Sequence, residues 1–413
     1  MVIIQDKSRC SGCAACAQVC PSKCVTMKPD VEGFLYPITD KDACIDCGLC
    51  TKVCHEQHPY EGRRPLNVYA AYCTDQAVRL ASSSGGLYSL LAKKMLENGG
   101  VVFGARFNSS WQVEMGYTEN HTGMEALRGS KYVQAKVGEA YRDVRRFLEY
   151  GRQVLFCGTP CQVSGLRHFL NKDYGNLLLV DFACHGVPSP RVWEVYLKEI
   201  ARSGGGDYSA LSKKDAYLRG FLSNMTLRPS CYNCKAKSGR SHSDITLADF
   251  WGIERLLPEM DDDCGVSLLM VNTDKGRRAI DWSQIRCVET DYDNAVACNP
   301  SVTTIASLHP RRKQFFIRLK KEKHVAKLIE QELRPGIKWR LLFFWKALRK
   351  GKIDLSLLGG YERGVETDFR FCGHEYQINS VCFRNKRNGW RDYFVEIRKY
   401  EDNLETKEIK ESE

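Results

Sequence analysis

The chain has 413 residues and a mass of 47.0 kDa, which is more than one compact core usually holds, so we expect two or three folded units. Its 20 cysteines follow a start with neither the basic segment nor the long apolar run of a secretory signal. We therefore expect a cytoplasmic protein whose cysteines bind metal or are redox-active, and not a disulfide framework. No apolar run reaches the eighteen or so residues that cross a bilayer.

The net charge of +11 would suit a nucleic-acid-binding protein, but most of it lies in one segment. Residues 311–352 hold fifteen lysines and arginines against three acidic residues, so the rest of the chain is close to neutral. The positive charge therefore indicates what residues 311–352 bind, and it says nothing about the chemistry of the residues before them. Nucleic acid is the least favoured of these partners.

Nine cysteines lie between Cys10 and Cys54, and eight of them form a repeat. The spacing C-x2-C-x2-C-x3-C occurs twice, which is typical of bacterial ferredoxins with two 4Fe-4S clusters, where the fourth cysteine of each copy crosses to the other cluster. The first cluster is thus predicted to bind Cys10, Cys13, Cys16 and Cys54, and the second to bind Cys44, Cys47, Cys50 and Cys20.

Two structural zinc ions are the alternative for these eight thiols, but such sites usually show paired C-x-x-C knuckles separated by longer gaps. The repeat departs from the ferredoxin pattern in one place, since His55 and not proline follows Cys54. Cys24 lies outside the repeat and is interpreted as a small packed thiol. Residues 1–60 are therefore predicted to form an α+β ferredoxin-like dicluster domain.

Residues 58–65 contain two prolines and a glycine in a polar run and are interpreted as a linker. From 66 to about 310, strand-like apolar runs alternate with amphipathic helical patterns, which is typical of an α/β domain with a mixed sheet. We divide this domain into an N-terminal part, about 66–150, and a C-terminal part, about 151–310.

A helix start is marked by Thr159-Pro160, because a hydroxyl residue followed by proline suits the first helical turn. Strand 154–156, this helix and strand 176–182 therefore form a βαβ unit with parallel neighbouring strands. Three cysteines then emerge at the carboxyl edge of the sheet, where open α/β sheets place their sites: Cys157, Cys161 and Cys184.

Cys231-x2-Cys234 is the other close cysteine pair, and alone it fits zinc, a redox disulfide or a corner of an iron–sulfur site. Because Cys161 and Cys184 emerge together, the four thiols are predicted to form one further metal site. Zinc and an iron–sulfur cluster both stay open for this site.

Ser82-Ser83-Ser84-Gly85-Gly86 runs directly into a helix expected over 87–95. Hydroxyls, unhindered glycine amides and a helix N-terminus together suit a pyrophosphate, although a capped helix start without a ligand is an equal interpretation. Gly129-Ser130-Lys131-Tyr132 offers a hydroxyl and a cation to the same phosphates, or forms an ordinary turn.

Over about residues 66–310 the chain resembles the coenzyme F420 hydrogenase/dehydrogenase beta subunit family, whose motifs stand here in the family's order. The motifs are Ser83-Ser84-Gly85-Gly86, Gly129-Ser130-Lys131-Tyr132, Gly158-Thr159-Pro160-Cys161-Gln162, Cys184-His185-Gly186-Val187-Pro188-Ser189, Arg228-Pro229-Ser230-Cys231-Tyr232-Asn233-Cys234, Asp249-Phe250-Trp251-Gly252 and Gly265-Val266-Ser267. In many bacterial members a ferredoxin domain is fused in front.

The resemblance implies an FAD and a third 4Fe-4S cluster, with Cys157 outside the usual ligand positions. The implied ligands of the third cluster are Cys161, Cys184, Cys231 and Cys234. The implied flavin contacts are Ser83, Ser84, Gly85, Gly86, Ser130, Lys131, Tyr132, Gly158, Thr159 and Gln162. Clusters pass single electrons, most organic reductions need two together with protons, and a flavin converts between the two.

His185 and Asp249 are ionisable residues within the matched motifs and are the candidates for catalytic proton transfer. The alternatives are that His185 only hydrogen-bonds a cluster sulfur or the backbone, and that Asp249 only braces a turn. The family includes 7-hydroxymethyl chlorophyll a reductase and deazaflavin-using hydrogenase subunits, so the resemblance does not name a substrate.

Residues 311–352 interleave positive charge with apolar residues, which indicates a pair of amphipathic helices packed on the main domain. The functional options for their basic faces are an acidic ferredoxin, an anionic glycan-type or lipid-linked substrate, and peripheral contact with an anionic membrane. The rest of the extension, 311–413, is interpreted as a small appended unit to about Tyr400 and a frayed acidic end.

The main hypothesis is an enzyme: a ferredoxin-linked iron–sulfur flavoprotein that takes electrons from ferredoxin or another low-potential donor and reduces an organic small molecule. The alternative is an electron-transfer beta subunit of a larger oxidoreductase complex, F420-linked where the host makes that coenzyme, without a substrate of its own. A zinc-stapled nucleic-acid-binding protein is a remote alternative, and homo-oligomerisation stays open.

Overall fold

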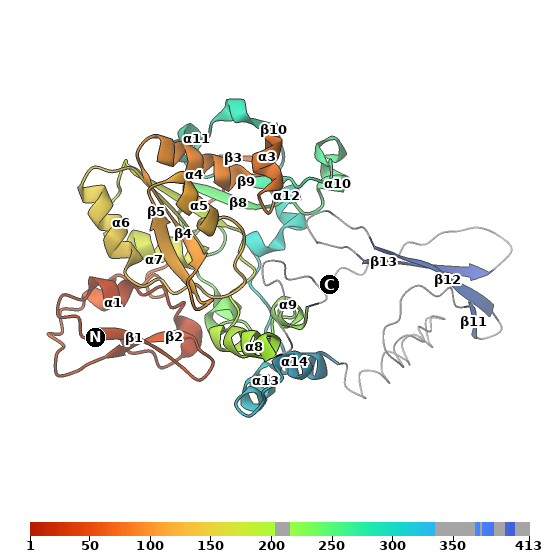
Figure 1. Ribbon diagram of the computed structural model, residues 1–413, viewed down its shortest axis with the longest axis horizontal. Coiled ribbons are helices and arrows are strands. Elements are labelled where there is room, and N and C mark those ends of the chain that lie inside the picture. The colour runs from red at the N-terminus through yellow and green to blue at the C-terminus, as the bar shows by residue number, and fades with distance from the viewer. Residues whose placement is uncertain (203–214, 335–367, 372–373, 384–392, 401–413) are drawn as a thin grey trace.

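The N-terminal unit is built on a small antiparallel sheet (Figure 1). The computed structural model describes residues 1–202, 215–334, 368–371, 374–383 and 393–400, and the last three ranges by their backbone alone. The elements of the N-terminal unit are η1 (Lys7–Arg9), α1 (Ala15–Val19), β1 (Val25–Pro29), β2 (Leu35–Thr39) and α2 (Leu49–Lys52).

An eight-stranded sheet forms the centre of the molecule, in the order β10-β3-β9-β8-β7-β6-β4-β5 (Figure 1). Neighbours among β4, β6, β7 and β8 run parallel, whereas the remaining pairs are antiparallel, so the predicted mixed sheet is confirmed. The strands are β3 (Asn67–Cys73), β4 (Val101–Phe107), β5 (Val113–Thr118), β6 (Val154–Gly158), β7 (Leu177–Phe182), β8 (Ile245–Asp249), β9 (Ser267–Val271) and β10 (Ile285–Glu289).

The βαβ unit has the predicted form, because β6 and β7 are parallel neighbours joined by α7 (Pro160–Leu170). Thr159 caps this helix: its backbone N–H donates to Gln162 Oε1 at 2.9 Å, in a capping box. The carboxyl ends of β6 and β7 thus carry Cys161 and Cys184 to one edge of the sheet.

Apolar side chains alternate along the central strands and divide the core into two layers. On one face, Phe103 and Phe156 pack against α6 (Ala140–Glu149), α7 and the N-terminal unit. On the other face, Leu155 packs beneath α4 (Leu87–Glu97). Also on this second face are α5 (His121–Leu127) and α11 (Asp274–Ala279).

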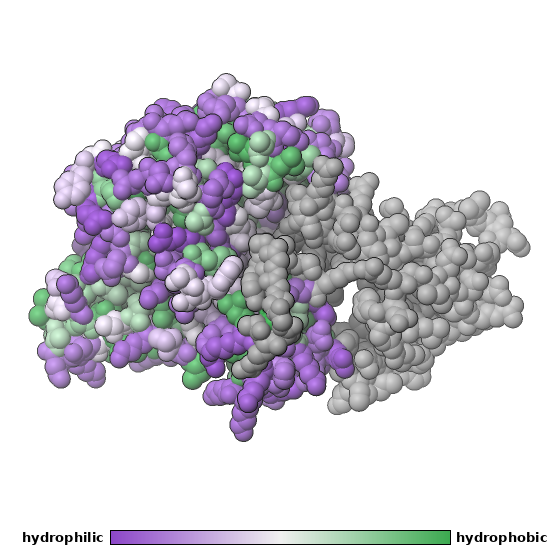
Figure 2. All heavy atoms as spheres, viewed as in Figure 1, coloured by the Kyte–Doolittle hydropathy of each residue, from purple (hydrophilic) through white to green (hydrophobic). Residues whose placement is uncertain are grey.

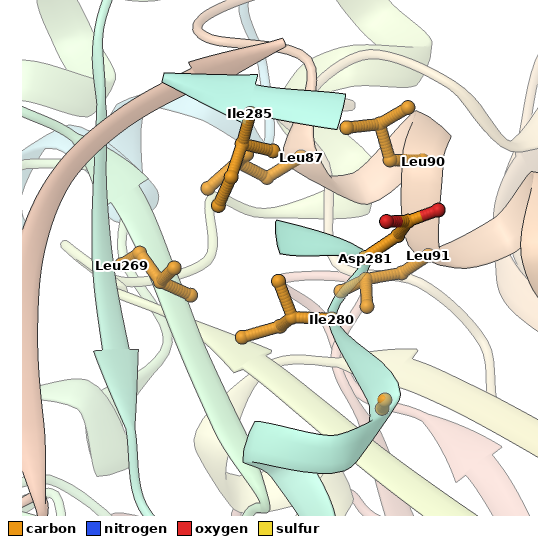
Figure 3. A pocket seen from close by; sticks show the side chains of 8 residues that line it. Leu87, Leu90, Leu91, Leu269, Ile280, Asp281 and Ile285 are labelled. Atoms are coloured by element: carbon orange, nitrogen blue, oxygen red, sulfur yellow. The ribbon is translucent and has the colours of Figure 1, made fainter. Parts of the chain in front are cut away.

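A pocket of about 290 Å³ lies beneath α4, between that helix and β9, β10 and the end of α11 (Figure 3). Leucine and isoleucine side chains converge on it, and Asp281 is the one charged residue of its lining. Because it lacks thiols and convergent polar groups, we interpret it as a gap in core packing and not as a redox site.

Four helices pack together below the sheet in Figure 1. They are α8 (Pro190–Arg202), α9 (Ala216–Leu222), α13 (Arg312–Leu319) and α14 (Val325–Leu333). The start of the basic segment thus forms a packed helix pair, whereas 335–352 lie outside the described residues. Arg312 is buried, and its guanidinium pairs with Glu32 of the N-terminal unit at 2.5 Å, so this cation holds two units together instead of facing water.

Short elements connect the larger ones: α3 (Gln76–Leu80), η2 (Pro229–Asn233), α10 (Ile253–Leu256), η3 (Pro258–Met260), η4 (Trp282–Gln284), α12 (Tyr292–Cys298) and η5 (Pro300–Val302). The C-terminal extension contains a three-stranded antiparallel sheet of β11 (Asp368–Phe371), β12 (His374–Phe383) and β13 (Tyr393–Tyr400). The acidic end at 401–413, expected to be frayed, lies outside the described residues. Each helix in the described part of the chain is too short or too polar to span a bilayer.

Candidate metal centres and cofactor site

The cysteine repeat is also a repeat of backbone conformation. Gly12 and Asp46 occupy the same position in the two copies and both have positive φ, +73° and +48°. Ala14 and Gly48 also correspond, at +60° and +73°. Positive φ is uncommon for residues other than glycine, so its recurrence indicates two loops wound in the same way around their three cysteines.

The first thiol group consists of Cys10, Cys13, Cys16 and Cys54. Burial, together with the nearby charges of Cys54 and Cys10, raises the pKa of Cys13 to about 12. Burial and the charges of Cys13, Cys10 and Cys54 raise the pKa of Cys16 as well. The structure therefore brings together the four predicted ligands of the first cluster, including the one that crosses from the second copy.

The second thiol group consists of Cys20, Cys44, Cys47 and Cys50, which line one cavity of about 300 Å³. Cys24 lines the same cavity, and its Sγ lies 3.4 Å from that of Cys20. Burial raises the pKa of Cys20, but hydrogen bonds with Ser22 and Cys24 outweigh it and bring the value to about 7. Cys24 is packed, as expected, but it is packed against a predicted ligand.

The third thiol group consists of Cys161, Cys184, Cys231 and Cys234. Burial, together with the charges of Cys231 and Cys234, raises the pKa of Cys184 to about 12. Burial and the charges of the three other thiols also raise the pKa of Cys161. The four thiols that strand order and the C-x-x-C pair suggested are thus neighbours. As the side chains stand, no three His, Cys, Asp or Glu residues in the described ranges are arranged to hold a metal ion.

Tyr141 of α6 lies between the first and third thiol groups. Its side chain is fully buried, and burial together with the charges of Cys13, Cys161 and Cys16 raises its pKa well above the ordinary value. Its hydroxyl donates to the Gln162 carbonyl at 2.7 Å. One buried side chain therefore contacts the surroundings of both groups.

The two motifs proposed for phosphate binding meet at Asp249. Burial raises the pKa of this carboxyl, and a hydrogen bond with Ser84 lowers it. Its charge, after burial, also raises the pKa of Tyr132 to about 12, while Ser130 bonds the Tyr132 hydroxyl. Asp249 therefore joins the two loops, which agrees with a bracing role as well as with proton transfer.

The Ser-Ser-Gly-Gly motif packs tightly against the strands. The Gly85 N–H donates to Ser267 Oγ at 3.0 Å, and a Cβ on Gly85 would lie 2.5 Å from the Ala71 carbonyl oxygen. Ser84 Oγ donates to the Val266 carbonyl at 3.0 Å, whereas Ser83 is exposed. The Gly85 amide and Ser84 hydroxyl thus already have protein partners.

Buried polar groups with unused hydrogen-bonding capacity lie beside Lys131 and Cys157. Tyr88 Oη and Arg128 Nε are buried without a hydrogen-bond partner. Burial and the charge of Cys157 raise the pKa of Tyr88, and the charge of Arg128 opposes them. Burial lowers the pKa of Lys131 to about 8, opposed by Cys157. Unpaired buried donors around a half-buried lysine, whose Nζ donates to the Arg128 carbonyl at 2.7 Å, fit a polyanionic ligand such as a dinucleotide.

The remaining predicted flavin contacts have structural partners. Gly158 ends β6, and Thr159 and Gln162 form the capping box of α7. Thr159 Oγ1 also lies 3.2 Å from Cys161 Sγ, so these residues shape the approach to the third thiol group. Their contact with a flavin stays a prediction.

His185 lies next to Cys184 and packs edge-on against Phe221, with ring centroids 5.1 Å apart. Burial lowers the pKa of this imidazole, opposed by Asn224, and His185 Nε2 is buried without a hydrogen-bond partner. An unpaired buried nitrogen is consistent with proton transfer, which stays a prediction.

Three buried residues near the thiols were not singled out by sequence reasoning: Tyr141, Arg228 and Lys237. Lys237 Nζ donates to the Ser301 carbonyl at 2.9 Å, and burial lowers its pKa against the charges of the third thiol group. Lys237 follows Cys234 by three residues, a spacing that gives a weak signal at best. Tyr141 carries no motif at all.

Three stretches of the chain match known families. Residues 9–57 match a 4Fe-4S dicluster domain, 68–142 match the coenzyme F420 hydrogenase/dehydrogenase beta subunit N-terminal domain, and 151–291 match the corresponding C-terminal domain. The chain belongs to this beta subunit family. It is therefore an iron–sulfur electron-transfer protein of an oxidoreductase family. Of the two main hypotheses, that of an electron-transfer beta subunit is the better supported.

The chain is similar to a solved structure, a chain of the F420-reducing [NiFe] hydrogenase complex from Methanosarcina barkeri, studied by xenon derivatization. The two share 17% identity with a TM-score of 0.42, over 68% of this chain and 96% of the other. No curated protein matches the chain.

Proposed function

We propose that the chain is the electron-transferring beta subunit of an oxidoreductase complex, carrying three 4Fe-4S clusters and one FAD. Tyr141 is the observation that carries the proposal, since this buried side chain packs in the same core cluster as Cys13, and its hydroxyl donates to the carbonyl of Gln162, the residue after Cys161. When bound, the clusters supply single-electron transfer and the flavin exchanges electron pairs.

The residues of this chain have distinct tasks in the proposal. The three thiol groups hold the clusters, and Lys131, Tyr88 and Arg128 hold the anionic part of the FAD. Tyr141 and the surrounding apolar core keep water out between the first and third groups, so charge there interacts through a medium of low dielectric constant.

The protein surface around the second thiol group supports the proposal of a partner protein. Cys47 is exposed, and its apolar sequence neighbours Ile45 and Leu49 are 66% and 36% exposed. Figure 2 shows apolar residues gathered over the N-terminal unit, at the left of the molecule. An apolar rim around an exposed ligand is typical of a surface that exchanges electrons with another protein.

A stand-alone reductase, with ferredoxin as donor and a small or glycan-type anionic substrate, is the second candidate. A cleft of about 390 Å³ favours it, because Cys184 lines the cleft together with Asp181, Lys237 and Asn272. Turnover of an organic substrate by the isolated chain with dithionite or reduced ferredoxin would support this candidate over the subunit proposal.

Metal and flavin analysis tests the proposal. Anoxically purified protein should contain about twelve iron atoms, about twelve sulfides and one FAD per chain. Dithionite reduction should give electron paramagnetic resonance signals of three clusters, and the isolated chain should hold its electrons until a protein acceptor is added. Zinc in place of iron at the third group, or the absence of flavin, would contradict the proposal.

Replacing Lys131 by methionine should weaken FAD binding about tenfold to hundredfold, because a charge-assisted hydrogen bond contributes roughly 1.5–3 kcal/mol. Flavin fluorescence titration of flavin-stripped protein measures the dissociation constant. Lys136→Met is the matched control, since Lys136 is an exposed lysine five residues away. Equal affinities of the Lys131 variant and the wild type would contradict the assignment.

A further inference from the structure

Arg228 is a buried arginine between the first and third thiol groups. Its side chain is 1% exposed, and the residue directly precedes the short helix η2 as its N-cap. Nε donates to the Cys10 carbonyl at 2.8 Å, and Nη2 lies 3.7 Å from Cys10 Sγ. The guanidinium is therefore directed at a predicted ligand of the first cluster.

The same residue is tied to the third thiol group through its backbone. The Cys231 N–H donates to the Arg228 carbonyl at 2.9 Å, and the positive charge of Arg228 is among the influences that lower the pKa of Cys231 against burial. Arg228, which stands in the motif that contains Cys231 and Cys234, thus contacts Cys10 of the first thiol group, 218 residues away in sequence.

The remaining contacts fix the guanidinium in place. Nη1 donates to Gln134 Oε1 at 3.0 Å, Nη2 donates to the Leu35 carbonyl at 2.9 Å, and the ring of Tyr36 lies 4.3 Å from the guanidinium carbon. A Cβ on Gly12 would lie 2.8 Å from Nη1, so the cluster-binding loop closes directly over the cation.

No carboxylate compensates this cation at close range. Among the described residues, no acidic group lies within ion-pair distance of Arg228. Arginine keeps its charge in proteins, and a buried cation without a counter-charge is costly, so the compensating negative charge must come from the thiolates and what they bind.

We propose that Arg228 is a positioning residue that raises the reduction potentials of the first and third clusters together. The inference rests on the proposed function. A four-thiolate cluster gains one negative charge on reduction, and a fixed buried cation between two such centres stabilises the reduced state of each. The cation thereby shifts the potentials of both clusters in the same direction.

Potentiometric titration monitored by electron paramagnetic resonance tests this proposal on the full chain. Arg228→Gln keeps hydrogen-bond donors but removes the charge, and it should lower the potentials of the first and third clusters while the second stays unchanged as an internal reference. Arg312→Gln is the matched control, because Arg312 is buried at the same interface but pairs with Glu32. Its three potentials should equal those of the wild type.

Arg228→Lys separates the charge from the guanidinium. Its shorter side chain retains a charge near Cys231 but cannot make both contacts with Cys10, so the first cluster should fall in potential and the third should change less. Unchanged potentials in the glutamine variant overturn the proposal. If that variant loses iron, an unchanged first cluster in the lysine variant overturns it instead. Wild-type protein without three clusters would refute the proposed function itself.

Discussion

Serine in place of Cys161 should remove about four of about twelve iron atoms and leave the other two clusters in place. Cys161 is half-buried in the first turn of α7, and the three other thiols whose charges help to raise its pKa all belong to the third group. The capping box of α7 uses Thr159 and Gln162, so the helix start should survive the substitution. Dithionite should still reduce the first and second clusters, but electrons that enter the chain through these two clusters should no longer reach the flavin.

Iron and sulfide analysis, with visible absorption of the dithionite-reduced protein, measures this result. Cys157→Ala is the matched control, because Cys157 is also half-buried, lies four residues before Cys161, and is not assigned as a ligand. That variant should keep all of its iron. Loss of iron from the Cys157 variant and its retention in the Cys161 variant would show that the third set of ligands is wrong.

The candidate ligands could be predicted from the sequence because each rule involved is local. A repeated spacing defines the first eight thiols, and the edge of one βαβ unit brings Cys161 and Cys184 beside the close pair Cys231 and Cys234. The mixed sheet followed in the same way from alternating strand and helix patterns.

The residues between the clusters could not be predicted, because their partners are distant in sequence. Tyr141 meets Cys13 and Cys161, and Arg228 meets Cys10, only once the N-terminal unit is docked on the main domain. Arg312 is a second case, since this cation of the basic segment pairs with Glu32, 280 residues away. Docking between units depends on shape and charge that no single motif encodes.

Alanine in place of Gly165 should destabilise the protein by about 1–3 kcal/mol, as overpacking of a core usually does. Gly165 lies in the middle of α7, where alanine would ordinarily stabilise a helix by roughly 0.5–1 kcal/mol. Here a Cβ would lie 2.8 Å from Cys13 Cβ and 2.9 Å from Cys13 Sγ and Tyr141 Oη. Neither neighbour can move freely, because Cys13 is a predicted ligand and the Tyr141 hydroxyl bonds the Gln162 carbonyl.

The clash should act on the contact between the N-terminal unit and α7, which brings the first and third clusters close together. We therefore expect a lower melting temperature of the iron-loaded protein and slower reduction of the third cluster through the first, measured by rapid-freeze electron paramagnetic resonance. Gly220→Ala is the control: it also lies within a helix, α9, but its Cβ would meet only the side chain of Ile329 at 3.2 Å. A Gly165 variant as stable and as fast as this control would mean that α7 does not pack against the first cluster, and the proposed task of Tyr141 between the first and third thiol groups would fail with it.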